Sequence, residues 1–190
     1  MPDANPEAFA FLSARRSHAA KFFVSGGAVP DRAALEPILQ AALRVPDHGK
    51  LEPWRLIVCR GPAMVRLGDL AAALADDAEM AAKGRAVYDT SGLAVAVISS
   101  PRDQAKVPEV EQRASAFALC MNLVNAAEAA GWGACWLTGW PAHDARWRAA
   151  AFACTEVERV AGMVHIGTVG SVAPDRPRPD MARVVEWRDA

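Results

Sequence analysis

The sequence lacks the features that mark secreted, membrane-spanning, metal-binding and nucleic-acid-binding proteins. Its 190 residues include four cysteines but no Cys-x-x-Cys pair, so neither a zinc site nor a redox dithiol is indicated. No segment approaches the ~20 apolar residues of a membrane span, and the N-terminus lacks the basic start and apolar core of a signal peptide. The 21 basic and 22 acidic residues leave no excess charge to attract nucleic acid. We therefore expect a cytoplasmic protein with buried free thiols that binds no metal, nucleic acid or membrane.

Motifs for covalent catalysis and for Rossmann-type nucleotide binding are also missing. The stretch Gly131 to Gly133 is not a G-x-G-x-x-G fingerprint, and it leads into an apolar strand instead of a helix. There is no G-x-S-x-G nucleophile elbow, and the four histidines do not have metal-ligand spacing. The sequence thus offers no catalytic dyad of its own.

Apolar periodicity and turn residues predict an α+β domain with long helices and few strands. Asp3 or Asn5 is placed to cap a first helix that ends near Arg15 and Arg16. The pattern predicts further helices over about 31–45, 63–85, 109–130 and 143–152, and strands over 55–59, 93–98, 131–138 and 158–167. In this pattern the acidic run 76–79 is a solvated helix face, and the apolar run 93–98 is a strand buried on both faces.

The chain is expected to form a single domain (1–170) followed by an extended C-terminal arm (171–190). The arm is rich in proline over 172–180 and ends in the alternating segment 184–187, which is suited to a sheet edge. The helix predicted over 109–130 is apolar nearly all round, and 52% of the chain is hydrophobic. One small subunit has little room to bury that much apolar surface, so we expect a homodimer with the arm packed on the partner subunit.

A candidate anion-binding site lies at the end of the first predicted helix, where Arg15, Arg16 and Ser17 follow one another. Guanidinium groups bind phosphate through paired charge-assisted hydrogen bonds, and a serine hydroxyl adds a neutral donor. The two arginines are equally suited to balancing the negative C-terminal end of that helix. The pattern therefore leaves a phosphate site and a helix-end role both open.

A second basic segment lies between the second predicted helix and the strand at 55–59. It offers three potential donors, Arg44, His48 and Lys50, beside the flat aromatic ring of Trp54. Next to a phosphate cradle, such a loop suits a flat ligand with a phosphate tail. Taken alone, His48 is also explained as a structural hydrogen-bonded histidine, and Trp54 as a core residue.

Together these segments resemble the nitroreductase family, whose members are FMN-dependent enzymes that oxidise NAD(P)H. The resemblance rests on Arg15 to Ser17, on Ala42 to His48, and on Glu52 to Trp54 with an apolar strand behind it. The segments Lys106 to Gln112 and Ala126 to Gly139, on either side of the long apolar helix, are similar to the family as well. The match covers nearly the whole chain and is to the short, compact bacterial subgroup.

The resemblance implies a nitroreductase-like fold, with a central, mostly antiparallel sheet flanked by helices in an intertwined homodimer. It implies FMN as cofactor, NADH or NADPH as hydride donor, and a nitroaromatic, quinone or similar small acceptor in a ping-pong cycle. The residues implied to contact FMN are Arg15, Arg16, Ser17, Arg44, His48, Trp136, Leu137 and Thr138. We expect the first five of these to come from one chain of the dimer.

Parts of this assignment stay open at the level of sequence. Arg178 and Arg183 are both candidates for a late arginine that closes the phosphate site. The subgroup often has an Arg-Ser pair after the tryptophan, whereas this chain has Leu137 and Thr138, so the contact from that arginine side chain is lost. One alternative function is a flavin-dependent dehydrogenase or an enzyme that consumes reduced FMN. The other is a flavin-binding protein without turnover.

Overall fold

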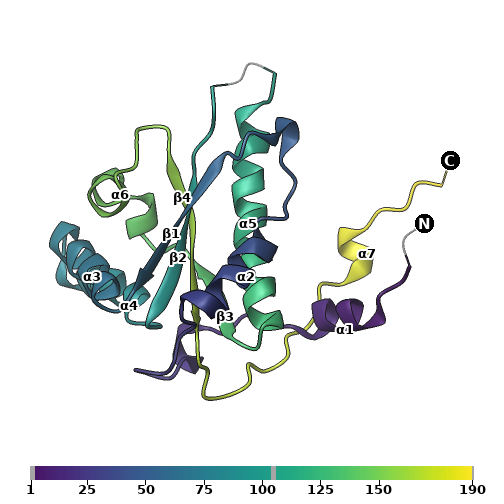
Figure 1. Cartoon of the computed structure of the whole chain (residues 1–190), viewed down its shortest axis with the longest axis horizontal. Coiled ribbons are helices and arrows are strands. Elements are labelled where there is room, and N and C mark those ends of the chain that lie inside the picture. The colour runs from purple at the N-terminus through teal and green to yellow at the C-terminus, as the bar shows by residue number, and fades with distance from the viewer. Residues whose placement is uncertain (1–2, 104–105, 190) are drawn as a thin grey trace.

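Four antiparallel strands form the central sheet, and helices cover both of its faces (Figure 1). The computed structural model describes residues 3–103 and 106–189. The strands are β1 (Trp54–Arg60), β2 (Leu93–Ser99), β3 (Gly133–Leu137) and β4 (Arg159–Gly167). They lie in the order β1-β2-β4-β3, and every neighbouring pair is antiparallel. The predicted α+β class with a mostly antiparallel sheet is confirmed.

The helices form two layers around this sheet (Figure 1). One face carries α2 (Arg32–Ala42) and α5 (Glu109–Ala129), and the other carries α3 (Pro62–Leu74), α4 (Ala78–Tyr88) and α6 (Ala145–Phe152). Two short helices, α1 (Pro6–Ala14) and α7 (Met181–Val184), lie on the side of α5 away from the sheet. Short 3-10 helices span Ala20–Phe22 (η1), His48–Lys50 (η2) and Pro141–His143 (η3).

Strand β2 separates two hydrophobic cores, because its side chains alternate between the faces of the sheet. Val95 and Val97 face the core that includes buried residues of α2 and α5. Ala96 and Ile98 face the core that includes buried residues of α3, α4 and α6. Every residue of β2 is buried, which confirms the strand buried on both faces.

Helix α5 is the longest element and lies across one face of the sheet. Its buried side chains, which include Leu119, Leu123 and Ala127, follow the i, i+4 spacing of one helix face. The sequence predicts burial all round, but within one subunit part of the helix is open, and the Phe117 side chain is 45% exposed. A partly exposed apolar face of this kind is typical of a surface that another chain covers.

The single helix predicted over 63–85 is wrong, and α3 and α4 replace it. α3 ends at Leu74, after which Ala75 has extended backbone angles. Oδ1 of Asp77 accepts a 2.7 Å hydrogen bond from the amide of Met80 and so caps the N-terminus of α4. The acidic run 76–79 therefore contains the break between α3 and α4 and the N-terminal cap of α4. It is not one continuous helix face.

The C-terminal arm has no regular secondary structure over 172–180 and then forms α7. Its last segment pairs with no strand of its own subunit within residues 3–103 and 106–189, so the prediction of a sheet edge is not met inside one chain. The Trp187 side chain is 79% exposed. The outer edge of β1 is likewise left unpaired by the described part of the chain.

Candidate functional site

Four arginines line a basic hollow between the end of α1 and the C-terminal arm. The hollow has a volume of about 560 Å³ and is lined by Leu12, Ser13, Arg15, Arg16, Arg176, Pro177, Arg178 and Pro179. Guanidinium groups match the geometry of a phosphate and carry the opposite charge. The phosphate reading of the Arg-Arg pair is therefore favoured over a role limited to balancing the helix end.

The backbone on either side of α1 fixes two of these arginines. The Asn5 side chain caps the start of the helix, as predicted. The helix ends because Arg15 has a ψ of 145°, outside the helical region. The amide of His18 then donates a 2.9 Å hydrogen bond to the carbonyl oxygen of Ala134 in β3. The segment between them, with Arg16, is thus held between α1 and the edge of the sheet.

The arm supplies the other two arginines of the hollow. The Arg178 guanidinium donates a 2.7 Å hydrogen bond to the carbonyl oxygen of Ser13 in α1 and a 3.0 Å bond to Oδ1 of Asp175. Of the two late arginines considered from the sequence, Arg178 lines the hollow and Arg183 does not. Sequence reasoning missed Arg176, although its spacing of two residues from Arg178 in an extended segment placed both on one side.

Several buried polar atoms of the arginines and of their neighbours have no hydrogen-bond partner in the described part of the chain. Among the described residues, Nε of Arg15, Nε of Arg16, Nδ1 of His18 and Oε1 of Glu128 are buried without a hydrogen-bond partner. Unpaired buried donors are costly unless a further group completes their bonding. These atoms are closed off from solvent, so the fit of the hollow to a phosphate rests on the four guanidinium groups that line it. Ser17, by contrast, is exposed and is not among the lining residues.

Strand β3 runs beside this region and ends in the predicted flavin-lining residues. The indole Nε1 of Trp136 donates a 3.0 Å hydrogen bond to the carbonyl oxygen of Ala161, and its ring stacks on Phe117 with the centroids 6.1 Å apart. Trp136 is therefore tied to its own subunit. Leu137 and Thr138 follow it and are half-buried, so both retain surface that a ligand can contact.

The loop that carries His48 lies beside the first turn of α5. Nδ1 of His48 is 2.7 Å from Oε2 of Glu111 in the first turn of α5, and both side chains are exposed. The carboxylate of Asp47 accepts hydrogen bonds from two amides of the loop, at 2.9 and 3.0 Å. Lys50 and Glu52 have φ values of 54° and 48°, which non-glycine residues rarely adopt. Such strain is concentrated at functional sites, so the loop remains a candidate.

Two further hydrogen bonds connect this loop to α5, one in each half of the helix. Nε1 of Trp54 donates a 3.0 Å hydrogen bond to Oγ of Ser115, so the core-packing interpretation of this tryptophan is favoured. The Asn122 amide donates a 3.2 Å hydrogen bond to the carbonyl oxygen of Arg44. The Arg44 side chain is exposed.

The structure does not bring Arg15 and His48 together within one chain. Arg15 lies against Glu128, and His48 lies against Glu111, which is seventeen residues earlier on the same helix. That separation corresponds to about 25 Å along the axis of α5. Because α5 holds Arg15 and His48 apart, the geometry does not favour the expectation that one chain supplies both to the same site, which stays a prediction.

The family model described as "Nitroreductase family" matches residues 12–168. The chain belongs to the nitroreductase family. Among its relatives, "Putative NAD(P)H nitroreductase YdjA" from Escherichia coli K12 is 31% identical over 143 residues, which cover 73% of this chain and 78% of that protein.

Solved structures of the same family share the fold. A nitroreductase-like family protein from Bacillus cereus matches with a TM-score of 0.83 at 19% identity and covers 100% of both chains. A nitroreductase with bound FMN from Bacteroides fragilis matches with a TM-score of 0.73 at 21% identity, covering 98% of this chain and 100% of that one. The nitroreductase-like fold implied by the sequence is confirmed.

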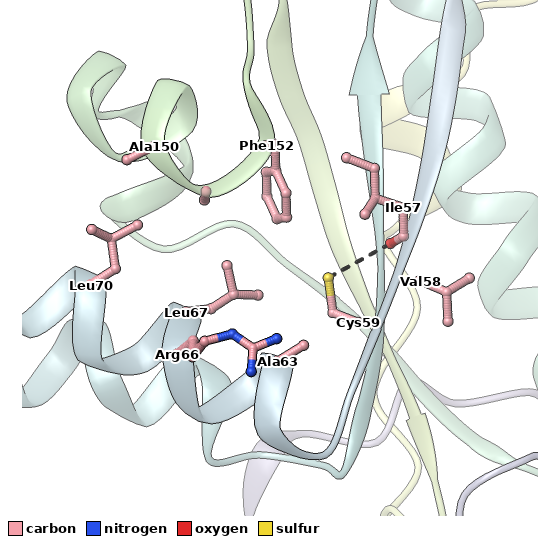
Figure 2. Close-up of a pocket in the computed structure, with 10 residues that line it drawn as sticks. Ile57, Val58, Cys59, Ala63, Arg66, Leu67, Leu70, Ala150 and Phe152 are labelled. Atoms are coloured by element: carbon pink, nitrogen blue, oxygen red, sulfur yellow. Dashed lines mark hydrogen bonds between the residues drawn. The ribbon is translucent and has the colours of Figure 1, made fainter.

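A second hollow of this nitroreductase-family chain lies on the opposite face of the sheet, between β1, α3 and α6 (Figure 2). Its volume is about 360 Å³, and its walls include Ile57, Cys59, Leu67 and Phe152. Burial raises the pKa of the Cys59 thiol to about 11, so this thiol is protonated at neutral pH. Arg66 is the one charged residue among those that line it, so the hollow is less suited to a phosphate than the first one.

Two further properties bear on the class of site. Within residues 3–103 and 106–189, no group of three or more His, Cys, Asp or Glu side chains is placed to hold a metal ion. No helix in the described part of the chain is long and apolar enough to cross a membrane.

Proposed function

We propose that this nitroreductase-family chain is an FMN-dependent oxidoreductase. It takes hydride from NADH or NADPH and reduces a nitroaromatic, a quinone or a similar small acceptor in a ping-pong cycle. The observation that carries the proposal is the hollow lined by four arginines, Arg15, Arg16, Arg176 and Arg178. The FMN phosphate supplies the charge and the acceptor oxygens that these groups require.

The chain's own residues then bind and orient the cofactor. Arg15, Arg16, Arg176 and Arg178 hold the phosphate, and the segment Trp136 to Thr138 lines the flavin from β3. Bound FMN supplies the hydride chemistry, which is why no catalytic dyad is needed in the sequence. Leu137 and Thr138 contribute backbone groups and shape, because neither carries a charge.

Each site is built by two chains in this proposal. Since α5 separates Arg15 from His48 by about 25 Å, His48 reaches the flavin from the second copy of the chain. The exposed Phe117 face of α5 forms part of the contact between the copies. A homodimer therefore completes the predicted set of flavin contacts that one subunit leaves apart.

The arm (171–190) of each copy packs on the other in the same dimer. The unpaired edge of β1 is flanked by the hollow of Figure 2 on one side and by a second apolar groove beside α2 on the other, and Val58 lines both. An unpaired strand edge next to apolar grooves is a surface that proteins normally cover. The arm carries an exposed Trp187 suited to this role.

The proposed function is tested with the purified protein under anaerobic conditions. Its visible spectrum is recorded after FMN is added, then after NADH or NADPH, and finally after a nitroaromatic or a quinone. Bleaching by a nicotinamide and recovery of the oxidised spectrum with the acceptor are the expected results. Bound FMN that neither nicotinamide reduces would identify a flavin-binding protein without this turnover. A protein that does not take up FMN at all refutes the proposal.

A further inference from the structure

We propose that Glu128 is a positioning residue that aligns Arg15 and His18 behind the phosphate site, and that it takes up a proton from solvent when the cofactor phosphate binds. The inference rests on the proposed function, because it assumes that the four-arginine hollow holds the FMN phosphate. It makes cofactor loading dependent on pH through one carboxyl group.

The geometry around Glu128 shows a carboxylate that approaches Arg15 and His18 at distances too long for good hydrogen bonds. Glu128 lies in the last turn of α5, and its side chain is 6% exposed. Its Oε2 is 3.5 Å from Nε of Arg15, and its Oε1 is 3.3 Å from Nδ1 of His18. Charge-assisted N–H···O bonds are normally about 2.7–2.9 Å long. Both nitrogens and Oε1 accordingly remain without a hydrogen-bond partner among the described residues.

A second buried carboxylate of the same chain shows what an ordinary ion pair looks like here. Glu158 accepts two hydrogen bonds from the Arg55 guanidinium, at 2.8 and 3.1 Å, and this pairing lowers the pKa of its carboxyl to about 2. At Glu128, burial instead raises the pKa to about 7, although Arg15 and Arg16 act in the opposite direction. The arginines therefore stabilise the ionised form of Glu128 only weakly.

The groups that face Glu128 come from each element packed around it. The segment after α1 contributes Arg15, Arg16 and His18, and β3 contributes Cys135, which is close enough for Glu128 to raise the pKa of its thiol. Across the hollow, the arm contributes Asp175, Arg176 and Arg178.

Among these groups, Glu128 is the one poised to titrate near neutral pH. Burial lowers the pKa of His18 below its ordinary 6.5, so this ring is neutral above pH 7. Burial raises the pKa of Cys135 to about 12, and the pKa of Asp175 is lowered by an amide and by Arg178. Arginine side chains stay charged in proteins. Between pH 7 and 8.5, a proton exchanged by this cluster therefore belongs to Glu128.

Phosphate binding and Glu128 ionisation oppose each other. The phosphate brings close to two negative charges to the arginines that partly stabilise the Glu128 carboxylate. Like charges in one site favour the protonated carboxyl, so the pKa of Glu128 rises further when FMN binds. A group that binds a proton more tightly in the complex makes binding weaken as the pH rises above its free pKa. FMN affinity is thus expected to fall between pH 7 and 8.5.

The test measures FMN binding by flavin fluorescence at several pH values in wild type, Glu128→Gln and the control Glu79→Gln. Glu79 is exposed on α4, so its substitution makes the same charge change away from the site. For wild type and control, the dissociation constant should rise about three- to tenfold between pH 7 and 8.5. Glu128→Gln should bind with nearly constant affinity over this range, and more tightly than wild type at pH 8.5.

A matching pH dependence in Glu128→Gln and wild type overturns the inference and leaves the FMN assignment intact. Failure of wild type to bind FMN at any pH overturns the proposed function and the inference with it. Proton uptake by wild type alone provides a test that does not depend on the folding of the variant. Calorimetry at pH 7.5 in two buffers of different ionisation enthalpy should find about half a proton taken up per FMN bound. An uptake of zero contradicts the inference.

Discussion

Arg178 donates a 2.7 Å hydrogen bond to the carbonyl oxygen of Ser13, which joins the C-terminal arm to α1 across 165 positions of sequence. This bond closes one wall of the four-arginine hollow. Because the same guanidinium faces the proposed phosphate site, the bond couples the placement of the arm to cofactor binding.

Replacement of Arg178 tests that coupling. Arg178→Ala removes both the bond to Ser13 and a cation of the hollow, so we expect FMN binding to weaken by about 1.5–3 kcal/mol, or roughly 10- to 150-fold. Arg188→Ala is the matched control, since Arg188 lies in the same arm and pairs with Glu186 outside the hollow. Fluorescence titration measures the FMN affinity of both variants. Equal losses in the two variants would show that Arg178 has no special part in the site.

Replacement of Phe117 tests the proposal that two copies of the chain build each flavin site. We expect Phe117→Glu to convert a dimer into monomers and to reduce flavin occupancy, because it places a charge on the exposed apolar part of α5. Val65→Glu is the control, since Val65 is also exposed but lies on α3, across the sheet. Size-exclusion chromatography with light scattering reports assembly, and the ratio of flavin to protein absorbance reports occupancy. A wild-type monomer with full FMN occupancy would contradict the two-chain site.

Gly162 is required by the close approach of Trp136. A Cβ at Gly162 would overlap Nε1 and Cδ1 of the Trp136 indole and lie 3.0 Å from Sγ of Cys120. Gly162→Ala should therefore displace the indole and cost about 1–3 kcal/mol of unfolding free energy. At Gly170, a Cβ would meet its nearest neighbour at 3.4 Å, so Gly170→Ala serves as the control. Urea unfolding followed by tryptophan fluorescence compares them, and an unchanged Gly162→Ala midpoint would contradict the packing argument.

The Arg55–Glu158 pair predicts a pH dependence of stability. The pKa of Glu158 is lowered to about 2 in the folded protein from an ordinary value of 4.5, chiefly by the Arg55 hydrogen bonds. Its contribution is therefore complete above pH 4.5 and is lost as the pH falls through about 2. At pH 7, Glu158→Gln should cost about 1.5–3 kcal/mol.

The matched variant for this prediction is Glu156→Gln, since Glu156 is a nearby exposed carboxylate. At pH 3 the loss of unfolding free energy caused by Glu158→Gln should shrink to about half or less of its value at pH 7. At that pH the carboxyl of Glu158 is protonated in the unfolded wild type but still ionised in the folded protein. Urea unfolding at the two pH values measures the change. A penalty that is the same at pH 7 and pH 3 would rule out an ionised Glu158 as its source.

The elements that could be predicted from the sequence are those defined by local patterns. The continuous apolar run of β2 and the long apolar run of α5 identified both, and Asn5 identified the start of α1. The break between α3 and α4 was missed because alanines continue the helical pattern on both sides of it. Only the cap formed by Asp77 reveals it, and the same residue is compatible with an exposed helix face.

The candidate site could be predicted only in part, for a different reason. Arg15 and Arg16 are adjacent in sequence and were found, whereas Arg176 and Glu128 join them through contacts across more than a hundred residues. The separation of His48 from this cluster depends on how the loop lies along α5, and no local pattern encodes that. Motif spacing therefore identified the ligand class more reliably than the division of contacts between two chains.

The most direct test of the central claim compares FMN with riboflavin, which lacks the phosphate, by equilibrium dialysis against wild type and Arg16→Ala. If the four-arginine hollow holds the phosphate, wild type should bind one FMN per chain and bind riboflavin at least about 100-fold more weakly, since several charge-assisted hydrogen bonds are lost. Arg16→Ala should narrow that difference by weakening FMN alone. Equal affinity of wild type for FMN and riboflavin would contradict the account.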